Sequence, residues 1–246
     1  MKALILGGTK GIGRAVARQL AERGDAIMLL GREPHDLERS ARDLEARSGG
    51  KLKVATALCD LSDPQGFLAA FDAAERDLPG FDTVIVTAAL FGTQDELEAD
   101  IDRAQLLLTV NFANTVVFCE HARKRLIARG GGTLCVVSSV AGERGRKPVV
   151  LYGASKAGLS AYLEGLDHKY RALGLKTVTV KPGFVKTGMT SGLTPPPFAG
   201  EPEGVARDIV KAMEAGKPVV YTPRMWALVM LVIRWLPRFV MRKIGF

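Results

Sequence analysis

The sequence predicts an α/β fold in which a doubly wound sheet of about seven parallel strands carries helices on both faces. Three observations support this prediction. Short apolar runs alternate with helical segments along most of the chain. A glycine-rich turn joins the first apolar run to the first helix, as it does in dinucleotide-binding sheets. The 246 residues are enough for one large core, and no internal boundary divides them.

We therefore expect residues 1–222 to form a single domain of the Rossmann type and residues 223–246 to form a basic amphipathic tail. The N-terminus enters a strand at once, without the segments of a secretory signal, so we expect the chain to fold in the cytoplasm. The cysteines are widely spaced within apolar runs and predict neither disulfides nor a metal site. We expect buried thiols at Cys59, Cys119 and Cys135.

The first strand, at residues 2–6, is followed by a glycine-rich turn and by a helix with apolar positions from Ala15 to Ala21. This order predicts a dinucleotide site, because the turn lets the backbone approach a pyrophosphate and the helix N-terminus favours an anion. The alternative is a purely structural turn. The expected cofactor contacts from this loop are Gly7, Thr9, Lys10, Gly11, Ile12 and Gly13.

The second strand, at residues 25–30, ends at Gly31 and Arg32. Dinucleotide folds that prefer NAD usually place an acidic residue here, which binds the ribose 2′-hydroxyl. This chain has Arg32 instead, and Lys10 adds a second cation to the same region. Two cations without an acid favour a 2′-phosphate, and hence NADPH. The alternative is that both are solvated surface charges.

The next two elements continue the alternation. Residues 33–48 predict a polar-faced helix, and residues 51–58 predict a third strand that ends before Asp60 and Leu61. Asp60 either accepts a hydrogen bond from the adenine amino group or caps the helix that begins near Pro64. The sequence does not separate these two roles. We expect both Asp60 and Leu61 to contact the cofactor.

A fourth strand is expected at residues 81–87, where apolar and β-branched residues predominate, and Ala88 follows its carboxyl end. A long helix follows from about residue 101 to residue 129, and three glycines close it. Asn111 lies within this helix. A lone asparagine there is usually a surface or tertiary hydrogen-bonding residue, but its place ahead of Tyr152 makes it a candidate for the site.

The residues with the clearest chemistry lie around the fifth strand, at residues 133–137, and the helix at residues 151–173. The strand delivers Ser139 at its carboxyl end, where ligands sit in open parallel sheets. Tyr152 and Lys156 are four apart at the start of the helix, so they share one helical face. A nearby ammonium favours the phenolate and would bring a pKa of about 10 toward the working range of a general acid or base.

A sixth strand is expected at residues 175–180, followed by the segment PGFVKT. Residues 188–201 mix glycine, serine, threonine and three consecutive prolines, and a long loop of this kind often covers a site. A helix at residues 202–215 and a last strand at residues 218–221 complete the alternation.

The net charge of +8 is concentrated in one segment. Residues 217–246 contain six Lys or Arg and no Asp or Glu, so the rest of the chain carries only +2, with 28 Lys and Arg against 26 Asp and Glu. Because the charge is not spread over the domain, we do not expect a nucleic-acid-binding protein.

The tail has the composition of a membrane-surface segment. Residues 225–233 are apolar without interruption, but nine residues fall short of the about 20 that span a bilayer. Arg234, Arg238 and Arg242 recur every four residues beside Trp and Phe, and Pro237 is expected to bend the segment. We therefore expect contact with a membrane surface through residues 223–246. The alternative is an element that packs across the substrate pocket or against another subunit.

Taken together, these motifs resemble the short-chain dehydrogenase/reductase family over essentially the whole chain. The matches are LGGTKGIG in place of TGxxxGxG, the helix asparagine, the serine thirteen residues before the tyrosine, YGASK, and PGFVKT. There are two departures. Leu6 replaces the usual threonine, and TAAL at residues 87–90 replaces the family's NNAG.

The resemblance implies an NAD(P)-dependent oxidoreductase that acts on CH–OH and C=O groups. Its catalytic residues would be Asn111, Ser139, Tyr152 and Lys156. In reduction Tyr152 would give a proton to the developing alkoxide, Ser139 would hydrogen-bond the same oxygen, and Asn111 would hold a water that returns protons from solvent. Lys156 would lower the tyrosine pKa and bind the ribose hydroxyls.

The resemblance also implies further cofactor contacts and an assembly. Tyr152 and Lys156 would touch the cofactor as well as the substrate. The segment after the sixth strand would line the nicotinamide side through Pro182, Gly183, Val185 and Thr187. The family further implies a homo-oligomer, either a dimer or a tetramer.

A narrower resemblance points to the decaprenylphosphoryl-2-keto-erythro-pentose reductases. It rests on SSVAGERGRKPVVLYGASKAGL and on the Arg- and Trp-rich tail. It implies a lipid-linked sugar, or another apolar carbonyl compound, reduced at the cytoplasmic membrane face. One alternative is a general reductase of small soluble carbonyls whose tail builds an oligomer. Another is a non-catalytic NADPH-binding scaffold or sensor, which would not need the proton-transfer groups.

Overall fold

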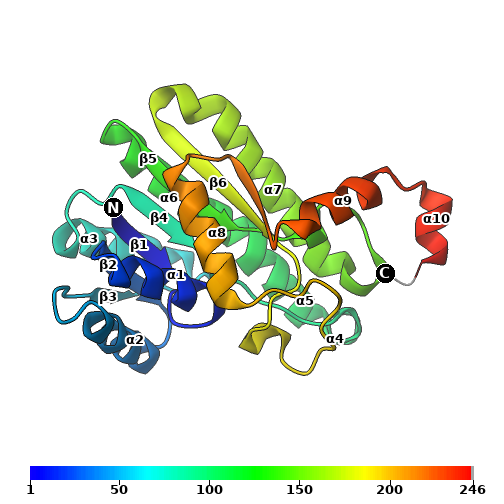
Figure 1. Cartoon of the computed structure of the whole chain (residues 1–246), viewed down its shortest axis with the longest axis horizontal. Helices are drawn as coiled ribbons and strands as arrows, with labels where there is room; N and C mark the ends of the chain where they lie inside the picture. The colour runs from blue at the N-terminus through cyan, green and yellow to red at the C-terminus, as the bar shows by residue number, and fades with distance from the viewer. Residues whose placement is uncertain (245–246) are drawn as a thin grey trace.

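The computed structural model describes residues 1–244, so the last two residues of the expected tail lie outside the described residues. One sheet of seven parallel strands has the order β3-β2-β1-β4-β5-β6-β7 (Figure 1). The order changes direction between β1 and β4, and this reversal creates the crevice in which doubly wound sheets bind ligands. The strands are β1 (Lys2–Leu6), β2 (Ala26–Gly31), β3 (Ala55–Leu58), β4 (Thr83–Val86), β5 (Gly132–Val137), β6 (Leu175–Pro182) and β7 (Val219–Thr222).

Helices cover both faces of this sheet, which confirms the predicted α/β fold. The helices are α1 (Gly11–Glu22), α2 (Pro34–Arg47), α3 (Phe67–Asp77), α4 (Gln94–Ala99), α5 (Ile101–Leu108), α6 (Thr115–Ala128), α7 (Val150–Tyr170), α8 (Pro202–Glu214), α9 (Met225–Trp235) and α10 (Arg238–Lys243). In Figure 1, α8 crosses the near face of the sheet.

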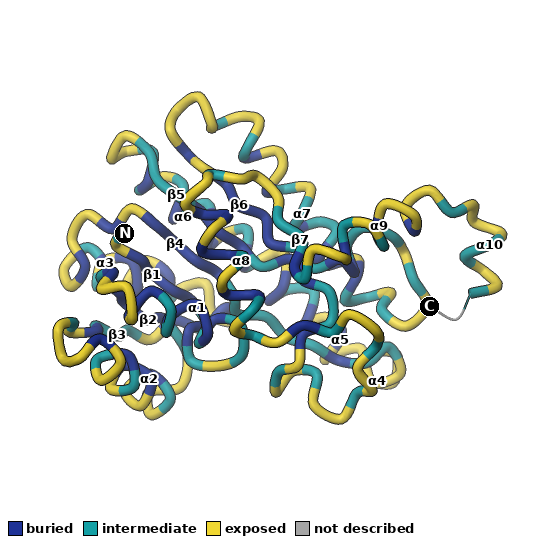
Figure 2. Tube along the Cα trace, in the orientation of Figure 1, coloured by how far each residue is buried: buried dark blue, intermediate teal, exposed yellow. Residues whose placement is uncertain are grey.

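Successive side chains of the central strands supply two separate cores. Leu4 and Leu6 of β1 point to the face that is covered by α3, α6 and α7, where Phe67 and Phe118 are fully buried. Ile5 points to the opposite face, which is covered by α1, α2 and α8. The central strands therefore form the buried centre of the molecule, as the dark tube in Figure 2 shows.

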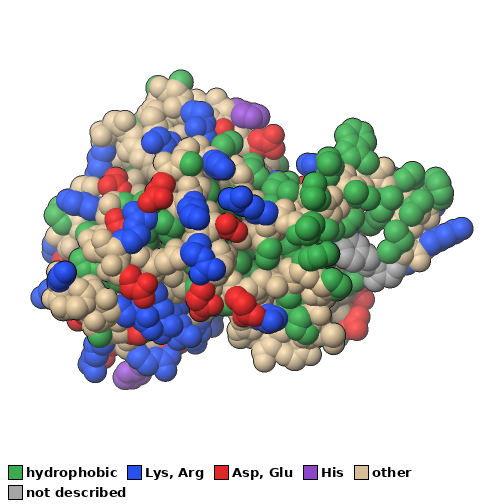
Figure 3. All heavy atoms as spheres, in the orientation of Figure 1, with side chains coloured by type: hydrophobic (Ala, Val, Ile, Leu, Met, Phe, Trp, Pro, Cys, Tyr) green, Lys and Arg blue, Asp and Glu red, His purple; other side chains and the backbone are tan. Residues whose placement is uncertain are grey.

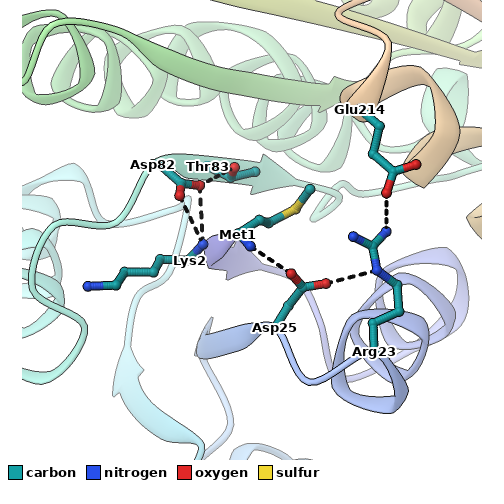
Figure 4. Close-up of polar contacts among 7 residues, drawn as sticks. All are labelled: Met1, Lys2, Arg23, Asp25, Asp82, Thr83 and Glu214. Carbon is teal, nitrogen blue, oxygen red and sulfur yellow. Dashed lines mark hydrogen bonds and ion pairs between the residues drawn. The ribbon is translucent and has the colours of Figure 1, made fainter.

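Ion pairs at the N-terminus tie β1 to its neighbours (Figure 4). The terminal amine of Met1 lies 2.7 Å from Asp25 Oδ1. Asp25 Oδ2 lies 3.1 Å from Arg23 Nε, and Arg23 Nη1 lies 2.6 Å from Glu214 Oε1 at the end of α8. These ion pairs therefore join the first strand, the α1–β2 turn and α8 at the amino-terminal ends of the strands.

Two predicted elements differ from the structure in instructive ways. The third strand begins at Ala55 rather than at residue 51, because side chains at the end of α2 bind the preceding backbone. Ser48 Oγ accepts from Leu52 N at 3.1 Å, and Glu45 Oε1 accepts from Val54 N at 2.9 Å. The helix expected from residue 101 to 129 contains a π-helical turn at Thr109–Asn114, which separates α5 from α6.

The tail forms two short helices, α9 and α10, which meet at the expected bend before Arg238 and project away from the sheet (Figure 1). Within residues 1–244, no helix combines the length and the apolar character that crossing a bilayer requires. The three cysteines are buried and unbridged, as expected.

Candidate active site

A cavity of about 890 Å³ opens at the carboxyl ends of the central strands. It is lined by every predicted cofactor and catalytic residue except Asn111. These lining residues are Gly7, Thr9, Lys10, Gly11, Ile12, Gly13, Arg32, Asp60, Leu61, Ala88, Ser139, Tyr152, Lys156, Pro182, Gly183, Val185 and Thr187.

The glycine loop packs so closely on the residues that follow β4 that larger side chains would not fit. Gly7 has a φ of +92°, and a Cβ built there would lie 2.5 Å from Ala88 N. A Cβ on Gly13 would lie 2.2 Å from Gly7 O. Thr87 Oγ1 donates to Gly7 O at 3.0 Å. The threonine of the TAAL segment therefore holds the chain after β4 against the glycine loop. The tight loop brings the start of α1 directly against the cavity.

The start of α1 has the features of an anion site. Among the described residues, no side chain caps this helix, and its first turn has no acidic residue. The first backbone N–H groups of a helix have no partners within the helix and carry part of its positive dipole. An uncapped helix start beside closely packed glycines is the arrangement that binds a pyrophosphate in dinucleotide folds, so the predicted role of this loop agrees with its geometry.

Each of the two cations expected near the ribose lies beside an acidic residue. Lys10 Nζ lies 2.7 Å from Asp36 Oδ2, and Arg32 Nε lies 3.6 Å from Glu33 Oε1. All four residues line the cavity. The premise that this region lacks an acid is therefore wrong, because the start of α2 carries Asp36 back beside the glycine loop. Lys10 holds the pKa of Asp36 below its usual range.

Asp60 and Leu61 form a fixed edge of the cavity. Asp60 Oδ1 accepts from Ser62 N at 2.8 Å, so its carboxylate closes a local turn. The cap of the following 3₁₀ turn is Asp63, which accepts from Gln65 N, and not Asp60. The backbone oxygen of Leu61 accepts from the side chain of Asn114 at 2.7 Å. Asp60 is thus held in a turn that its own carboxylate closes, and the backbone of Leu61 is held by the side chain of Asn114.

Asn111 lies behind the cavity wall and is almost fully buried. Its amide makes two hydrogen bonds with Leu90: Leu90 N donates to Oδ1 at 2.7 Å, and Nδ2 donates to Leu90 O at 2.8 Å. The asparagine therefore holds the segment after β4 in place. The water-holding role expected for Asn111 stays a prediction.

Tyr152 and Lys156 lie one helical turn apart at the start of α7, as their spacing predicts. Lys156 Nζ is 5.8 Å from the centre of the Tyr152 ring and donates to Val137 O at 3.1 Å. The ring of Phe91 packs edge-on against the tyrosine, with centroids 5.2 Å apart. The lysine is buried, and the tyrosine is half-buried.

The protonation of this pair differs from the prediction. Burial raises the pKa of Tyr152 to about 12, and a hydrogen bond with Ser139 opposes this in part. Burial lowers the pKa of Lys156 to about 8. The pKa of Tyr152 is therefore raised and not lowered as expected, because desolvation of the phenol is the largest effect on it.

The two serines after β5 have different roles. Ser138 is buried, and its Oγ donates to Lys156 O at 3.0 Å and shares a 2.7 Å hydrogen bond with Ser160 Oγ. Ser139 Oγ accepts from Ala141 N at 3.0 Å and lies close enough to Tyr152 to affect its pKa. Ser138 therefore fastens β5 to α7, whereas Ser139 shares the cavity surface with the tyrosine hydroxyl.

The segment after β6 forms the opposite wall of the cavity. Backbone hydrogen bonds join its start to the end of the predicted covering loop. Gly200 N donates to Phe184 O at 2.8 Å, and Lys186 N donates to Gly200 O at 2.9 Å. These bonds make a short bridge at the two ends of the predicted covering loop. Met189, Leu193 and Pro196 are loop residues that line the cavity.

The sequence did not reveal several residues on the substrate side. Trp226 of α9 lines the cavity, and its Nε1 donates to Phe198 O at 3.2 Å. A Cβ on Gly183 would lie 2.0 Å from that nitrogen, so glycine is needed for the indole to pack here. Phe91, Arg146 and Val149 also line this half, and burial lowers the pKa of Arg146. The only sequence signal was the option that the tail packs across the pocket.

Comparison with known proteins agrees with this geometry. A family model described as short chain dehydrogenase matches residues 1–197. An uncharacterized oxidoreductase of Mycobacterium tuberculosis is 35% identical over 98% of this chain and 95% of its own length. Carbonyl reductase family member 4 of Xenopus laevis is 27% identical over 86% of this chain and 90% of its own length.

Solved structures share the fold. Actinorhodin polyketide ketoreductase, solved with NADPH, superposes with a TM-score of 0.80 at 18% identity, over 90% of this chain and 95% of its own. The glycine loop, the strand order and the matched family model lead to one conclusion. The chain belongs to the short-chain dehydrogenase/reductase family and is an NAD(P)-dependent oxidoreductase.

Proposed function

We propose that the protein is an NADPH-dependent ketoreductase in which Tyr152 is the general acid. One observation carries the proposal: Tyr152, Ser139 and Lys156 meet on the wall of a cavity whose other end is formed by the uncapped start of α1. When bound, NADPH supplies the hydride that reduces the carbonyl carbon. The chain's own residues then have to bind the carbonyl oxygen and supply its proton.

The side chains divide this work between them. The Ser139 hydroxyl donates a hydrogen bond to the carbonyl oxygen and holds the carbonyl in place. The Tyr152 hydroxyl transfers its proton to the same oxygen as negative charge develops there. The Lys156 ammonium, 5.8 Å from the ring centre, stabilises the tyrosinate that this transfer leaves behind. Asn111 keeps the adjacent wall in place through Leu90.

The preference for NADPH over NADH is supported by Lys10 and Arg32 on the cavity wall and by Gly31, which stands where NAD folds usually have an acid. Asp36 and Glu33 pair with these cations, and a bound 2′-phosphate would compete for them.

Replacing Arg32 by Ala should raise KM for NADPH about tenfold or more, with KM for NADH nearly unchanged. Equal changes for both cofactors would contradict the preference.

The substrate that we propose is a lipid-linked sugar or another apolar carbonyl compound. The wall beside Tyr152 is largely apolar, with Phe91, Val149, Phe184, Leu193 and Trp226 on it. A substrate of this kind would be met at the cytoplasmic face of a membrane, and the tail is the element next to the cavity that would make the contact. The alternative is a small soluble carbonyl, with a tail that builds an oligomer.

NADPH oxidation by the purified chain separates these functions. The panel should contain small soluble ketones, ketones with long alkyl chains and a prenyl-phosphate-linked keto sugar. Turnover should be fastest with the apolar or lipid-linked compounds. Faster turnover of the small ketones would favour the soluble-carbonyl alternative. NADPH binding without turnover of any compound would favour the sensor and contradict the proposal.

A further inference from the structure

Helix α9 has two apolar faces, and residues 1–244 cover one of them. Trp226, Met230 and Ile233 are buried and pack with Val140 and Tyr221 in a core of their own. Their spacing of four and three residues places them on one side of the helix. This side attaches the tail to the domain.

The other side of the helix also carries apolar residues at helical spacing, and no other part of residues 1–244 covers them. Leu228, Leu231, Val232 and Trp235 follow one another by three, one and three residues, and their exposed fractions are 61, 49, 63 and 81%. Phe239 of α10 extends this surface, with 64% of its side chain exposed. We call these five residues the outer face of the tail. Figure 3 shows hydrophobic side chains gathered over this projecting part of the molecule.

Cations surround the outer face, and acids are missing from the same segment. The last acidic residue of the chain is Glu214, and six Lys or Arg follow it. Arg224 at the start of α9 has 81% of its side chain exposed, and Arg238, Arg242 and Lys243 of α10 are also exposed. Apolar side chains bordered by cations match a surface that has an apolar interior under an anionic layer.

The domain holds the tail in a fixed position. Arg144 Nη2 donates to Leu236 O at 2.8 Å, and Lys147 Nζ donates to Arg242 O at 2.6 Å. Arg234 Nε lies 3.4 Å from Glu143 Oε2, a nearly buried carboxylate that also binds Lys181 and accepts from Tyr221 OH. The outer face is therefore presented by contacts with the loop that connects Ser139 to Tyr152.

We propose that the outer face of the tail docks on the surface of an anionic lipid bilayer. An apolar surface could contact either a lipid bilayer or a second copy of the chain, and the positive charges around this one favour the bilayer. A second copy of the chain on the same surface would bring its own arginines against these arginines, because a two-fold interface pairs identical patches. Anionic headgroups would instead neutralise them.

Docking in this orientation would place the cavity near the lipid. Trp226 begins the same helix, faces inward and lines the cavity, so the cavity wall and the docking surface are two sides of one element. An apolar substrate could then pass from the bilayer to Tyr152 without crossing bulk water. This consequence rests on the proposed ketoreductase function, whereas the docking itself does not.

Sedimentation of the full-length chain with vesicles tests the docking. Vesicles of phosphatidylcholine with phosphatidylglycerol should bind the protein, vesicles of phosphatidylcholine alone should bind it much less, and added salt should weaken the binding. The double variants Trp235→Ser/Phe239→Ser and Arg238→Gln/Arg242→Gln should each lower the partition coefficient about tenfold or more.

Two matched variants control for general effects of surface mutation. Leu68→Ser replaces an exposed apolar residue of α3, and Arg42→Gln replaces an exposed cation of α2. Both should bind vesicles as the wild type does. Far-UV circular dichroism should be the same for all variants. The inactive variant Tyr152→Phe should also bind normally, so vesicle binding is measured independently of turnover.

Three results would overturn the proposal. The first is a wild-type chain that does not bind anionic vesicles. The second is equal binding by the wild type and the tail variants. The third is a particle mass, measured by light scattering, that falls to the monomer value in Trp235→Ser/Phe239→Ser while vesicle binding is absent. That outcome would assign the outer face to an interface between copies of the chain.

Discussion

Burial shifts the pKa values of the two central side chains in opposite directions, so that they move apart. The pKa of Tyr152 rises to about 12 and that of Lys156 falls to about 8. At neutral pH the phenol therefore keeps its proton and the lysine keeps most of its charge. This combination suits a proton donor in carbonyl reduction, because the phenol is protonated and the charged ammonium can stabilise the tyrosinate that forms.

The pH dependence of the reaction should follow the protonation of Lys156. Lys156 is charged below its pKa of about 8 and loses that charge as the pH rises through this value. We expect kcat/KM for carbonyl reduction to fall between about pH 7 and about pH 9, because the tyrosinate loses its stabilising cation. Initial rates of NADPH oxidation across this range check the prediction. Lys156→Met should be slower and lack this decline, and a flat wild-type profile would contradict the role.

The two neighbouring serines provide a matched pair of variants. Ser139→Ala should lower kcat about 10²-fold, because its hydroxyl faces the cavity, and should lower the unfolding free energy by no more than about 1 kcal/mol through the lost hydrogen bond from Ala141 N. Ser138→Ala should retain kcat within a few-fold and lower the unfolding free energy by about 2 kcal/mol, since two buried hydrogen bonds are lost. Steady-state kinetics and urea denaturation measure both effects. The opposite pattern would show that the roles are exchanged.

At the scale of elements, local patterns account for what could be predicted. The strand alternation and the glycine turn depend on neighbouring residues, and so does the four-residue spacing of Tyr152 and Lys156. The start of β3 could not be read from the sequence, because Glu45 of α2 and Ser48, which follows the helix, accept the backbone hydrogen bonds there. Asp36 was missed for a similar reason: only the folded α2 brings it to Lys10.

The substrate side of the cavity was the least predictable part. Trp226 reaches it from a helix 74 residues after Tyr152, and Phe91 reaches it from the segment that Asn111 fixes. Neither residue belongs to a motif. Their positions depend on packing between distant elements, which composition and periodicity do not record.

The two faces of α9 should respond differently to truncation. Met230 is fully buried on the inner face, so Met230→Ala should lower the unfolding free energy by about 2–5 kcal/mol through lost packing and a residual cavity. Leu231 is the adjacent residue and is half-exposed. Leu231→Ala should change stability by less than about 1 kcal/mol. Chemical denaturation of both variants is the measurement. Similar losses at the two positions would mean that the outer face is also covered in solution.

At the scale of the whole molecule, the chain has a second exposed apolar surface besides the outer face of the tail. Ile101, Leu106, Phe112 and Val117 run along α5, the π-helical turn and α6 with 39–72% of their side chains exposed. Apolar helix surfaces of this length commonly mark contacts between subunits. We expect the chain to form a homo-oligomer through this surface.

Light scattering of the purified chain measures the assembly. The wild type should have the mass of a dimer or tetramer, and Leu106→Glu/Val117→Glu should have a lower mass, because buried charges destabilise an apolar interface. Leu68→Glu on α3 is the control and should keep the wild-type mass. A monomeric wild type, or an unchanged mass in the double variant, would contradict this interface.

The most direct test of the central claim is the turnover of Tyr152→Phe. The substitution removes only the hydroxyl, so the variant should fold and bind NADPH with the wild-type dissociation constant. Its kcat/KM for carbonyl reduction should fall by at least about 10²-fold, because no proton is delivered to the developing alkoxide. Fluorescence titration with NADPH and initial-rate kinetics give both values. Turnover within a few-fold of wild type would contradict the assignment of Tyr152 as the general acid.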